Sequence, residues 1–280
     1  GGSPHPDMNV QVEGRTWHRV DFTGARMADA IFQDMVIDEC VFDNADLRDT
    51  RWAACQVTDS RFHGANLRNA RLSLRWYGTA PPSRWERCSF DDAHYVLDSL
   101  DYTEFIGCRL HFATWRDVKY INCRFENCSF AGPMNRVEFN SRPIEGTGRP
   151  NWKKEPIFPL TIANGDFSEA EFVDVGFYGC TFRNPTWNPK SWILEVANYG
   201  KVLKYISRKG IPNQSEGARL VKVFFEREMQ VLPRPEATLI FNLAVLKEDS
   251  DAVIQGFVDV FIDTSKKLSL PPPVVHGSRP

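Results

Sequence analysis

Cysteine and histidine have the widest chemistry of the residue types in this chain, since they bind metals, act as nucleophiles and form disulfides. The 280 residues include seven cysteines: Cys40, Cys55, Cys88, Cys108, Cys123, Cys128 and Cys180. Each takes the small position of a five-residue repeat, where a buried thiol behaves as a small hydrophobe. Because Cys88, Cys108 and Cys128 are spaced by twenty, they are expected to form one column. We therefore predict structural cysteines rather than a metal or redox site.

The histidines lie outside any known catalytic spacing. There are six of them: His5, His18, His63, His94, His111 and His276. None belongs to an HExxH pattern, and Gly-x-Ser-x-Gly, Walker and GxGxxG sequences are absent. Neighbouring carboxylates such as Asp91 and Asp92 occupy outward positions with no evident pocket around them. We predict a protein without catalytic residues, metal or cofactor, and therefore not an enzyme.

The element that must position these side chains is a repeat of five residues within 20–72. Every fifth residue there is large and apolar: Phe22, Met27, Phe32, Ile37, Phe42, Leu47, Trp52, Val57, Phe62, Leu67 and Leu72. In a chain that is 42% hydrophobic, such a succession arises by chance with a probability on the order of 10⁻⁴. Two places before each large residue lies a smaller one, for example Ala25 or Ala45. Neither a helix nor a flat strand has this period, so the pattern indicates a solenoid.

One large and one small inward side chain in every five residues fit a coil with four short sides. Residues twenty apart then stack at about 4.8 Å, the distance between paired strands. Stacked coils bury a continuous core that a single coil could not bury alone.

Three segments of the repeat carry a known signature. Ala25-Arg26-Met27, Ala45-Asp46-Leu47 and Ala65-Asn66-Leu67 match the sequence A(D/N)Lxx, and through them the chain resembles the pentapeptide-repeat family. The resemblance covers residues 20–187. It implies an all-β solenoid, namely a right-handed quadrilateral β-helix about as wide as a DNA duplex.

Two loops are expected to interrupt this β-helix. The repeat stops after Leu72, resumes at Cys88, stops again after Phe130 and returns from Gly165 to Trp187. The intervening segments, 73–87 and 131–164, are rich in proline and glycine, which favour loops. Val137 and Phe139 lie one place out of frame and could form a displaced side. The β-helix is thus expected over 15–187, with about six coils.

The pattern becomes helical after residue 187. Asn188 followed by Pro189 is typical of a helix start, and later helices are expected after Ser215 and after Asp249 or Ser250. Residues 236–247 fit a helix or a strand equally well. We expect a small α-helical region over 188–268, whose apolar faces are core or a self-association surface that includes Phe224, Phe225, Phe257 and Phe261.

Both termini are expected to lie outside these units. Residues 1–14 would comprise a cloning remnant, Gly1-Gly2-Ser3, and an N-terminal extension in which Val10 and Val12 could extend the sheet. Residues 269–280, with three consecutive prolines, would be a disordered tail. No signal sequence or membrane span is recognised, so the expected location is the cytoplasm.

The charges are distributed unevenly along the β-helix. The net charge of −2 gives no overall basic field, so neither direct nucleic-acid binding nor membrane binding is expected. Acidic residues dominate the first coils, and we predict an acidic strip of Asp29, Asp34, Asp38, Glu39, Asp43 and Asp59. Solvated surface charge is the alternative explanation. The first loop is basic and aromatic, and its predicted partner-binding residues are Arg75, Trp76, Tyr77, Arg84 and Trp85.

The family resemblance also implies a function. The best understood pentapeptide-repeat proteins protect type II topoisomerases, above all DNA gyrase, from poisons, and they include the Qnr-type resistance proteins and self-immunity proteins of antibiotic producers. They resemble B-DNA in width and charge, and in the Qnr type two projecting loops contact the enzyme. This chain is similar in having two loops beside an acidic first segment, although its second loop and its C-terminal region are longer.

The first hypothesis is therefore a DNA mimic that binds a type II topoisomerase, with a possible homodimer through the C-terminal region. The second is a scaffold or adaptor that uses the rod as a spacer and the helical end to recruit a protein. A third is a pathogen effector. Protection would require the loop and the acidic strip, whereas a scaffold would require the apolar face around Phe224 and Phe225.

Overall fold

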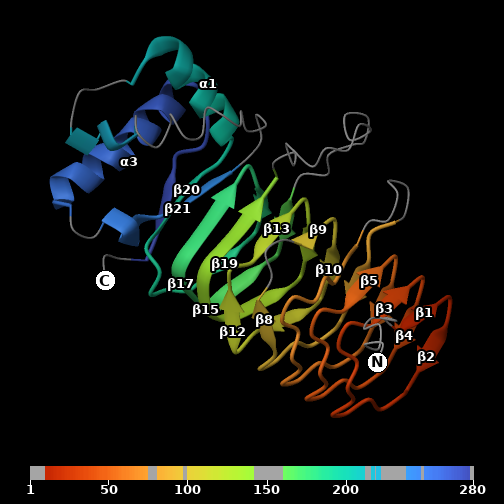
Figure 1. Cartoon of the computed structure of the whole chain (residues 1–280). Helices are drawn as coiled ribbons and strands as arrows, with labels where there is room; N and C mark the ends of the chain where they lie inside the picture. The colour runs from red at the N-terminus through yellow and green to blue at the C-terminus, as the bar shows by residue number, and fades with distance from the viewer. Residues whose placement is uncertain are drawn as a thin grey trace, which may run out of the picture.

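The computed structural model describes residues 10–74, 81–96, 100–141, 160–211, 216–217, 219–221, 238–246 and 249–277. The chain coils into a straight rod with the N-terminus at one end, and a smaller region of helices and strands closes the other end (Figure 1). The β-helix expected from the repeat is confirmed.

One sheet of the rod, here named the continuous face, contains one strand from each of eight coils. In order along the rod it consists of β2 (Thr16–His18), β4 (Val36–Asp38), β6 (Gln56–Thr58), β7 (Arg84–Glu86), β10 (Glu104–Ile106), β14 (Arg124–Glu126), β16 (Thr161–Ala163) and β18 (Thr181–Arg183). All of these strands pair in parallel, and Trp17 lies opposite Ile37, twenty residues later. The expected number of about six coils was too low.

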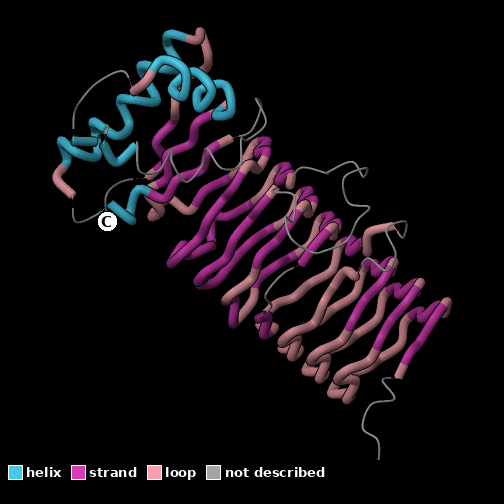
Figure 2. The backbone as a smooth tube through the Cα atoms, turned by 45° about the horizontal axis from the view of Figure 1, so that its top comes forward, coloured by secondary structure: helices cyan, strands magenta, loops and turns pink. Residues whose placement is uncertain are grey.

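The other sides of the coil are built from short strands, two long strands (β15 and β17) and isolated bridges. The strands are β1 (Gln11–Glu13), β3 (Ile31–Gln33), β5 (Arg51–Ala53), β8 (His94–Val96), β9 (Leu100–Asp101), β11 (Arg109–His111), β12 (Thr114–Arg116), β13 (Lys119–Ile121), β15 (Ser129–Asn140), β17 (Asp166–Tyr178) and β19 (Thr186–Trp187). Val12 pairs with Phe32, so the N-terminal segment extends the sheet as expected. Figure 2 shows the sides as parallel rungs.

On most sides of the coil one residue adopts positive φ, and the chain turns a corner there. Along one edge of the continuous face these residues form a column, here named the ladder corner: Arg19, Glu39, Asp59, Arg87, Gly107, Asn127, Asn164 and Asn184. Their φ angles lie between 47° and 61°. Glycine and asparagine adopt this conformation at the lowest cost, which accounts for their frequency at the corners.

The core is a set of stacked columns of inward side chains. In one column Phe42 stacks on Phe62 with ring centroids 4.7 Å apart, and Phe62 stacks on Phe90 at 5.1 Å. Trp52 and Trp85 lie beside this column and are fully buried. Each inward ring therefore contacts the coils above and below it.

The predicted C-terminal boundary of the first loop, 73–87, lies too far along the chain. Trp85 pairs with Val57, so Ser83 to Arg87 already form a side of the fourth coil, and Ser83 and Trp85 are fully buried. The two prolines at 81 and 82 resembled loop sequence and hid the return of the repeat. Residues 75–80 lie outside the described residues.

The second predicted loop, 131–164, was too long at both ends. Residues 131–140 belong to β15, where Phe139 pairs with Tyr120, nineteen residues earlier. Loss of one residue explains why Val137 and Phe139, both fully buried, lie out of frame, and the displaced side is confirmed. Ile162 then pairs with Phe125, so the coil has resumed by β16, and residues 142–159 lie outside the described residues.

Both interruptions occur at the same corner of the coil. The first follows the inward Leu72 and ends before the inward Ser83, and the second follows Phe139 and ends before Leu160. Each interruption therefore lies at the corner between the neighbouring side and the continuous face. The first lies just before β7 and the second just before β16. These strands are three levels apart in the sheet, or about 14 Å at strand-pairing distance.

The expected small helical region at the C-terminal end is present, and strands lie beside its helices. β20 (Ile193–Val196) pairs antiparallel with β21 (Leu239–Asn242) and with β22 (Val274–His276). Helices α1 (Tyr199–Lys209), η2 (Leu243–Leu246) and α3 (Asp251–Lys267) lie beside them. Through Ile240, β21 also pairs with Phe177 of β17, which attaches this region to the last coil. Neither α1 nor α3 is long and apolar enough to span a bilayer, and the same holds for all helices in the described residues.

The predicted helix start at Asn188 was wrong. The Asn188 side chain accepts a hydrogen bond from the backbone N–H of Lys190 at 2.9 Å and donates one to the carbonyl of Ala170 at 2.9 Å. This turn leads into strand β20, and the helix begins only at Tyr199. Trp192 and Ile193 fit helical and extended spacing alike, which explains the error.

The predicted helix start at Ser250 is confirmed, because its hydroxyl caps α3 by accepting a hydrogen bond from the N–H of Val253.

The prediction of a disordered C-terminal tail was wrong. Val275 pairs with Leu194, and His276 contacts Glu195 at 3.0 Å. The prediction that Phe257 and Phe261 belong to a self-association surface was also wrong, because both are buried in the core of this region. Phe224 and Phe225 lie outside the described residues.

Removing one ring from the aromatic column tests this account of the core. Phe62→Ala should lower the free energy of unfolding by about 3–5 kcal/mol, because it leaves a cavity between two stacked neighbours. Urea unfolding followed by circular dichroism measures the change. Val36→Ala, at a side chain that is 42% exposed, is the control and should cost about 0.5 kcal/mol or less. Equal effects of the two variants would contradict a continuous column.

Candidate protein-interaction surface

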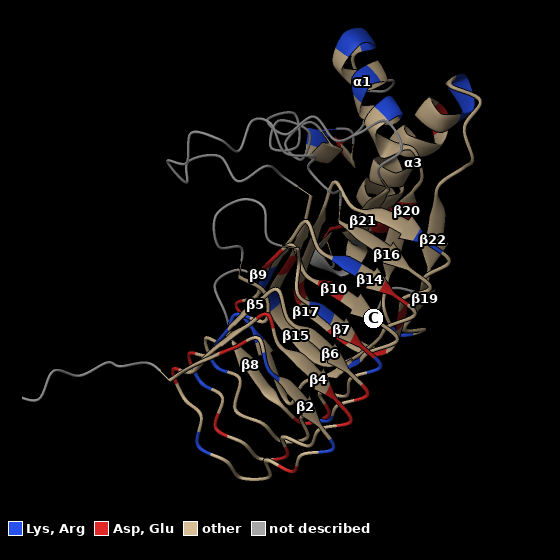
Figure 3. Cartoon of the chain, turned by 90° about the vertical axis from the view of Figure 1, so that its right-hand side faces the viewer, with Lys and Arg blue, Asp and Glu red and all other residues tan. Residues whose placement is uncertain are grey.

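The outward side chains of the rod form ladders because their backbones are stacked in register. On the continuous face, Arg84 lies 3.0 Å from Glu86 and 3.6 Å from Glu104. Arg124, one level beyond Glu104, contacts Glu126 at 2.5 Å. Figure 3 shows red and blue segments alternating along this part of the rod. The face is charged but nearly balanced in sign.

The ladder corner contains two ion pairs between stacked residues. Arg19 donates to Glu39 at 2.7 Å, and Arg87 donates to Asp59 at 2.6 Å. The hydrogen bond from Arg19 lowers the pKa of Glu39, and that from Arg87 lowers the pKa of Asp59. Two carboxylates stacked in one column are thus held between two arginines.

Farther along the same corner the charged residues give way to a ladder of asparagines. The Asn164 amide donates to Asn127 at 2.8 Å, and the Asn184 amide donates to Asn164 at 3.2 Å. Sequence reasoning missed this ladder because the second interruption separates Asn127 from Asn164. The twenty-residue interval between Asn164 and Asn184 was the available signal.

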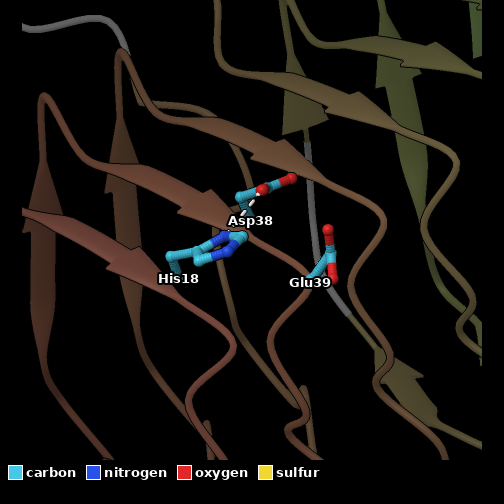
Figure 4. A group of neighbouring side chains, drawn as sticks. All are labelled: His18, Asp38 and Glu39. Carbon is cyan, nitrogen blue, oxygen red and sulfur yellow. Dashed lines mark hydrogen bonds and ion pairs between the residues drawn. The ribbon is translucent and has the colours of Figure 1, made fainter.

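His18, Asp38 and Glu39 form a group with donor atoms suited to a metal, and these atoms lie within 4.8 Å of one another (Figure 4). His18 Nδ1 lies 2.9 Å from Asp38, and the Thr58 hydroxyl donates to the other oxygen of Asp38 at 2.5 Å. The hydrogen bond from Thr58, followed by His18, lowers the pKa of Asp38. Since Glu39 is occupied by Arg19, a metal would have to displace a guanidinium, so this group is better described as part of the ladder.

The structure divides the predicted acidic strip among several parts of the coil. Asp38, Glu39 and Asp59 do stack on one side with Thr58, as expected. Asp43 lies on the next side, where it pairs with Arg61 at 2.7 Å. Asp29 and Asp34 occupy two other corners, as their positive φ angles indicate. The six residues therefore do not form one continuous strip.

The predicted loop contacts require one correction. Trp85 is fully buried, and its indole N–H donates to the carbonyl of Leu72 at 3.0 Å, so it cannot contact a partner. Arg84 is exposed on the continuous face. Arg75, Trp76 and Tyr77 lie outside the described residues, and their role stays a prediction.

The seven cysteines are all buried, as the repeat predicted. Their thiols approach backbone carbonyls of the coil, as Cys55 does at Phe32 with a distance of 3.3 Å. Burial raises the pKa of Cys55 and of Cys123 to about 12. Both thiols are therefore protonated at neutral pH, and a protonated thiol is a poor nucleophile.

A groove of about 600 Å³ lies where the last coil meets the C-terminal region. Its lining includes Ser168, Glu169 and Phe172 of β17, together with Lys190 and Trp192. No histidine or cysteine of the described residues lines it. Glu169, Glu171 and Lys190 give the lining charged groups of both signs.

A parallel coil with sides of five residues is the architecture of a quadrilateral β-helix. The family model described as pentapeptide repeats matches residues 18–51 and 37–73, and the described coil continues the same pattern to Trp187. The chain therefore contains pentapeptide repeats over this stretch. No curated protein sequence matches it significantly.

Solved structures of the same architecture resemble it at low identity. A trypsin-treated form of QnrB1, a plasmid-mediated fluoroquinolone resistance protein, is 15% identical over 74% of this chain and 100% of that chain, with a TM-score of 0.32. HetL, involved in heterocyst differentiation regulation in the cyanobacterium Nostoc, is 12% identical over 64% of this chain and 86% of that chain, with a TM-score of 0.24. Likenesses this weak carry no argument for a partner.

The ion pair at the ladder corner predicts an acid-sensitive carboxylate. Arg87→Gln should raise the pKa of Asp59 toward its ordinary value of about 3.9, because the donor that favours the carboxylate form is lost. A lowered carboxylate pKa contributes stability above the unfolded-state value, and this contribution is lost as pH falls through the folded-state value. Acidification below about pH 4 should therefore destabilise the native protein more than Arg87→Gln.

Carbon-13 NMR titration of the Asp59 carboxyl measures this shift directly. Arg51→Gln, on a different side of the coil, is the matched control and should leave Asp59 unchanged. An Asp59 midpoint that is the same in native protein and in Arg87→Gln would show that the pair does not form in solution.

Proposed function

We propose that this protein is a non-catalytic binding protein whose rod occupies a surface built for duplex DNA, and that its partner is a type II topoisomerase such as DNA gyrase. In this role it protects the enzyme from a poison, and it acts in the cytoplasm with the enzyme. The main observation in support of this proposal is the shape of the rod. Eight stacked coils extend for about 34 Å at strand-pairing distance, close to one turn of duplex at about 3.4 Å per base pair.

The rigidity of the rod supports this proposal. The interior is filled by stacked rings such as Phe42, Phe62 and Phe90, and each side is paired to its neighbours above and below. A close-packed interior resists deformation. A partner would therefore meet a fixed cylinder with polar side chains outward, as it meets a duplex.

The surface charge supports weak electrostatic attraction rather than strong steering. Many acids on the rod have a basic neighbour, as Glu39 has Arg19 and Asp43 has Arg61. Exposed pairs of this kind contribute little to stability. The association should still weaken with salt, because a DNA-binding surface is basic.

The common corner of the two interruptions supports a contact by loops. The segments after Leu74 and after Ser141 leave the coil at the same edge of the continuous face. Two insertions on one edge can meet the same partner surface, whereas insertions on opposite sides could not. Trp76 and Tyr77 of the first segment remain the proposed contact residues.

A supercoiling assay with gyrase and a fluoroquinolone tests this proposal. The intact protein should restore supercoiling, and Trp76→Ala/Tyr77→Ala should reduce that protection by about tenfold or more, as expected for loss of an aromatic anchor. Val274→Ala, which removes exposed apolar surface on β22 of the C-terminal region, is the control and should protect as well as the native protein.

Two outcomes would contradict the proposal in different ways. Absence of protection by the native protein, with several poisons tried, removes the topoisomerase as partner. Protection that is equal in native protein and in Trp76→Ala/Tyr77→Ala leaves the enzyme as partner but removes these two residues from the contact.

A further inference from the structure

The cationic side chains of helix α1 differ from the ion-paired arginines of the rod. On the rod, arginines such as Arg19, Arg61 and Arg87 each form an ion pair with a stacked carboxylate. Helix α1 contains no acidic residue, and its basic residues are Lys201, Lys204, Arg208 and Lys209. All four are exposed, and in the described part of the chain none of them forms an ion pair.

These four residues lie on one face of the helix. Lys201, Lys204 and Arg208 are separated by three and four residues, a spacing that aligns side chains on a helix, and Lys209 adjoins them. Val202, Leu203 and Ile206 form the opposite face and are buried in the C-terminal region. At about 1.5 Å per residue, Lys201 and Arg208 are about 10 Å apart along the axis. We name this surface, formed by Lys201, Lys204, Arg208 and Lys209, the basic face of α1.

The position of Lys201 argues against a purely structural explanation. Basic residues in the last turn of a helix are favoured by the helix dipole, which accounts for Arg208 and Lys209. Lys201 lies in the first turn, where the dipole disfavours a cation. The sequence thus keeps a positive charge where helix stability alone would select against it.

We infer that the basic face of α1 binds the phosphate backbone of a nucleic-acid duplex. Unpaired, solvent-exposed lysines and arginines in a row are the groups that neutralise phosphates and release their counterions. The whole-chain charge of −2 conceals this face because the paired charges of the rod cancel. In Figure 3 the blue segments of α1 lie at the end of the molecule farthest from the first coils.

The composition of the face favours a nucleic acid over other polyanionic partners. A helix that inserts into a lipid surface exposes large apolar residues beside its cations, whereas the apolar residues of α1 are turned into the core. Protein interfaces are depleted of lysine and enriched in aromatic residues at their centres. Apart from the four cations, the exposed residue of α1 is Ser207.

The inference does not depend on a topoisomerase partner and is tested by binding of the full-length protein to a labelled duplex of about 20 base pairs with arbitrary sequence. Fluorescence anisotropy should give a dissociation constant that rises steeply between about 50 and about 200 mM salt. Four phosphate contacts predict a slope of about −3 to −4 in the plot of log K against log salt.

Two double variants with the same charge change separate this face from the overall charge. Lys201→Glu/Lys204→Glu should weaken binding by about tenfold or more and reduce the salt slope by about 2. This variant should keep its fold, because acids near a helix N-terminus are favourable, and circular dichroism checks it. Lys266→Glu/Lys267→Glu, at exposed positions in the last turn of α3, is the matched control and should bind almost as well as the native protein.

Three results would overturn the inference. These are the absence of duplex binding at low salt, equal weakening by the two variants, and binding that follows the basic face only on vesicles of phosphatidylcholine and phosphatidylserine. The last result would assign the face to an anionic membrane instead. Loss of duplex binding without loss of topoisomerase protection would leave the proposed function intact, so the two proposals fail independently.

Discussion

Parallel pairing of each side with the side twenty residues later is the interaction on which the rest of this molecule depends. It places successive backbones one strand spacing apart, which is also a good stacking distance for aromatic rings, as Phe42 and Phe62 illustrate. Because one large and one small residue per side fill the interior, the remaining residues must face solvent or turn a corner. The buried cysteines, the corner asparagines and the outward ion pairs all follow from this register.

The coil could be predicted from the sequence where the spacing is uninterrupted, because a filled core requires an apolar residue at every fifth place between Phe22 and Leu72. It could not be predicted where the register changes. At Phe139 the loss of a single residue displaces the inward positions, and at Ser83 two prolines obscure them. The C-terminal strands were hidden for another reason: Ile193 and Leu194 are apolar in succession, which suits a buried strand or a buried helix, and only antiparallel pairing with distant segments decides between them.

The distribution of surface charge was even harder to predict from the sequence, because the effect of an ionic group depends on its neighbour in the next coil. Arg87 and Asp59 are 28 residues apart in the chain and yet form the closest pair of the ladder corner. Composition counts such groups as independent charges, whereas the structure shows them as neutral pairs. By the same reasoning, the lysines of α1 acquire their significance only once the partners of the other cations are known.

The corner that accommodates both interruptions has an evolutionary and engineering consequence. After each insertion the chain returns to the register it left, as shown by the pairing of Trp85 with Val57 and of Ile162 with Phe125. Added length therefore costs mainly loop-closure entropy, which grows slowly with length. New recognition segments could be acquired, lost or exchanged at this edge while the coil stays intact, and the same edge is the natural place to graft a foreign peptide for display.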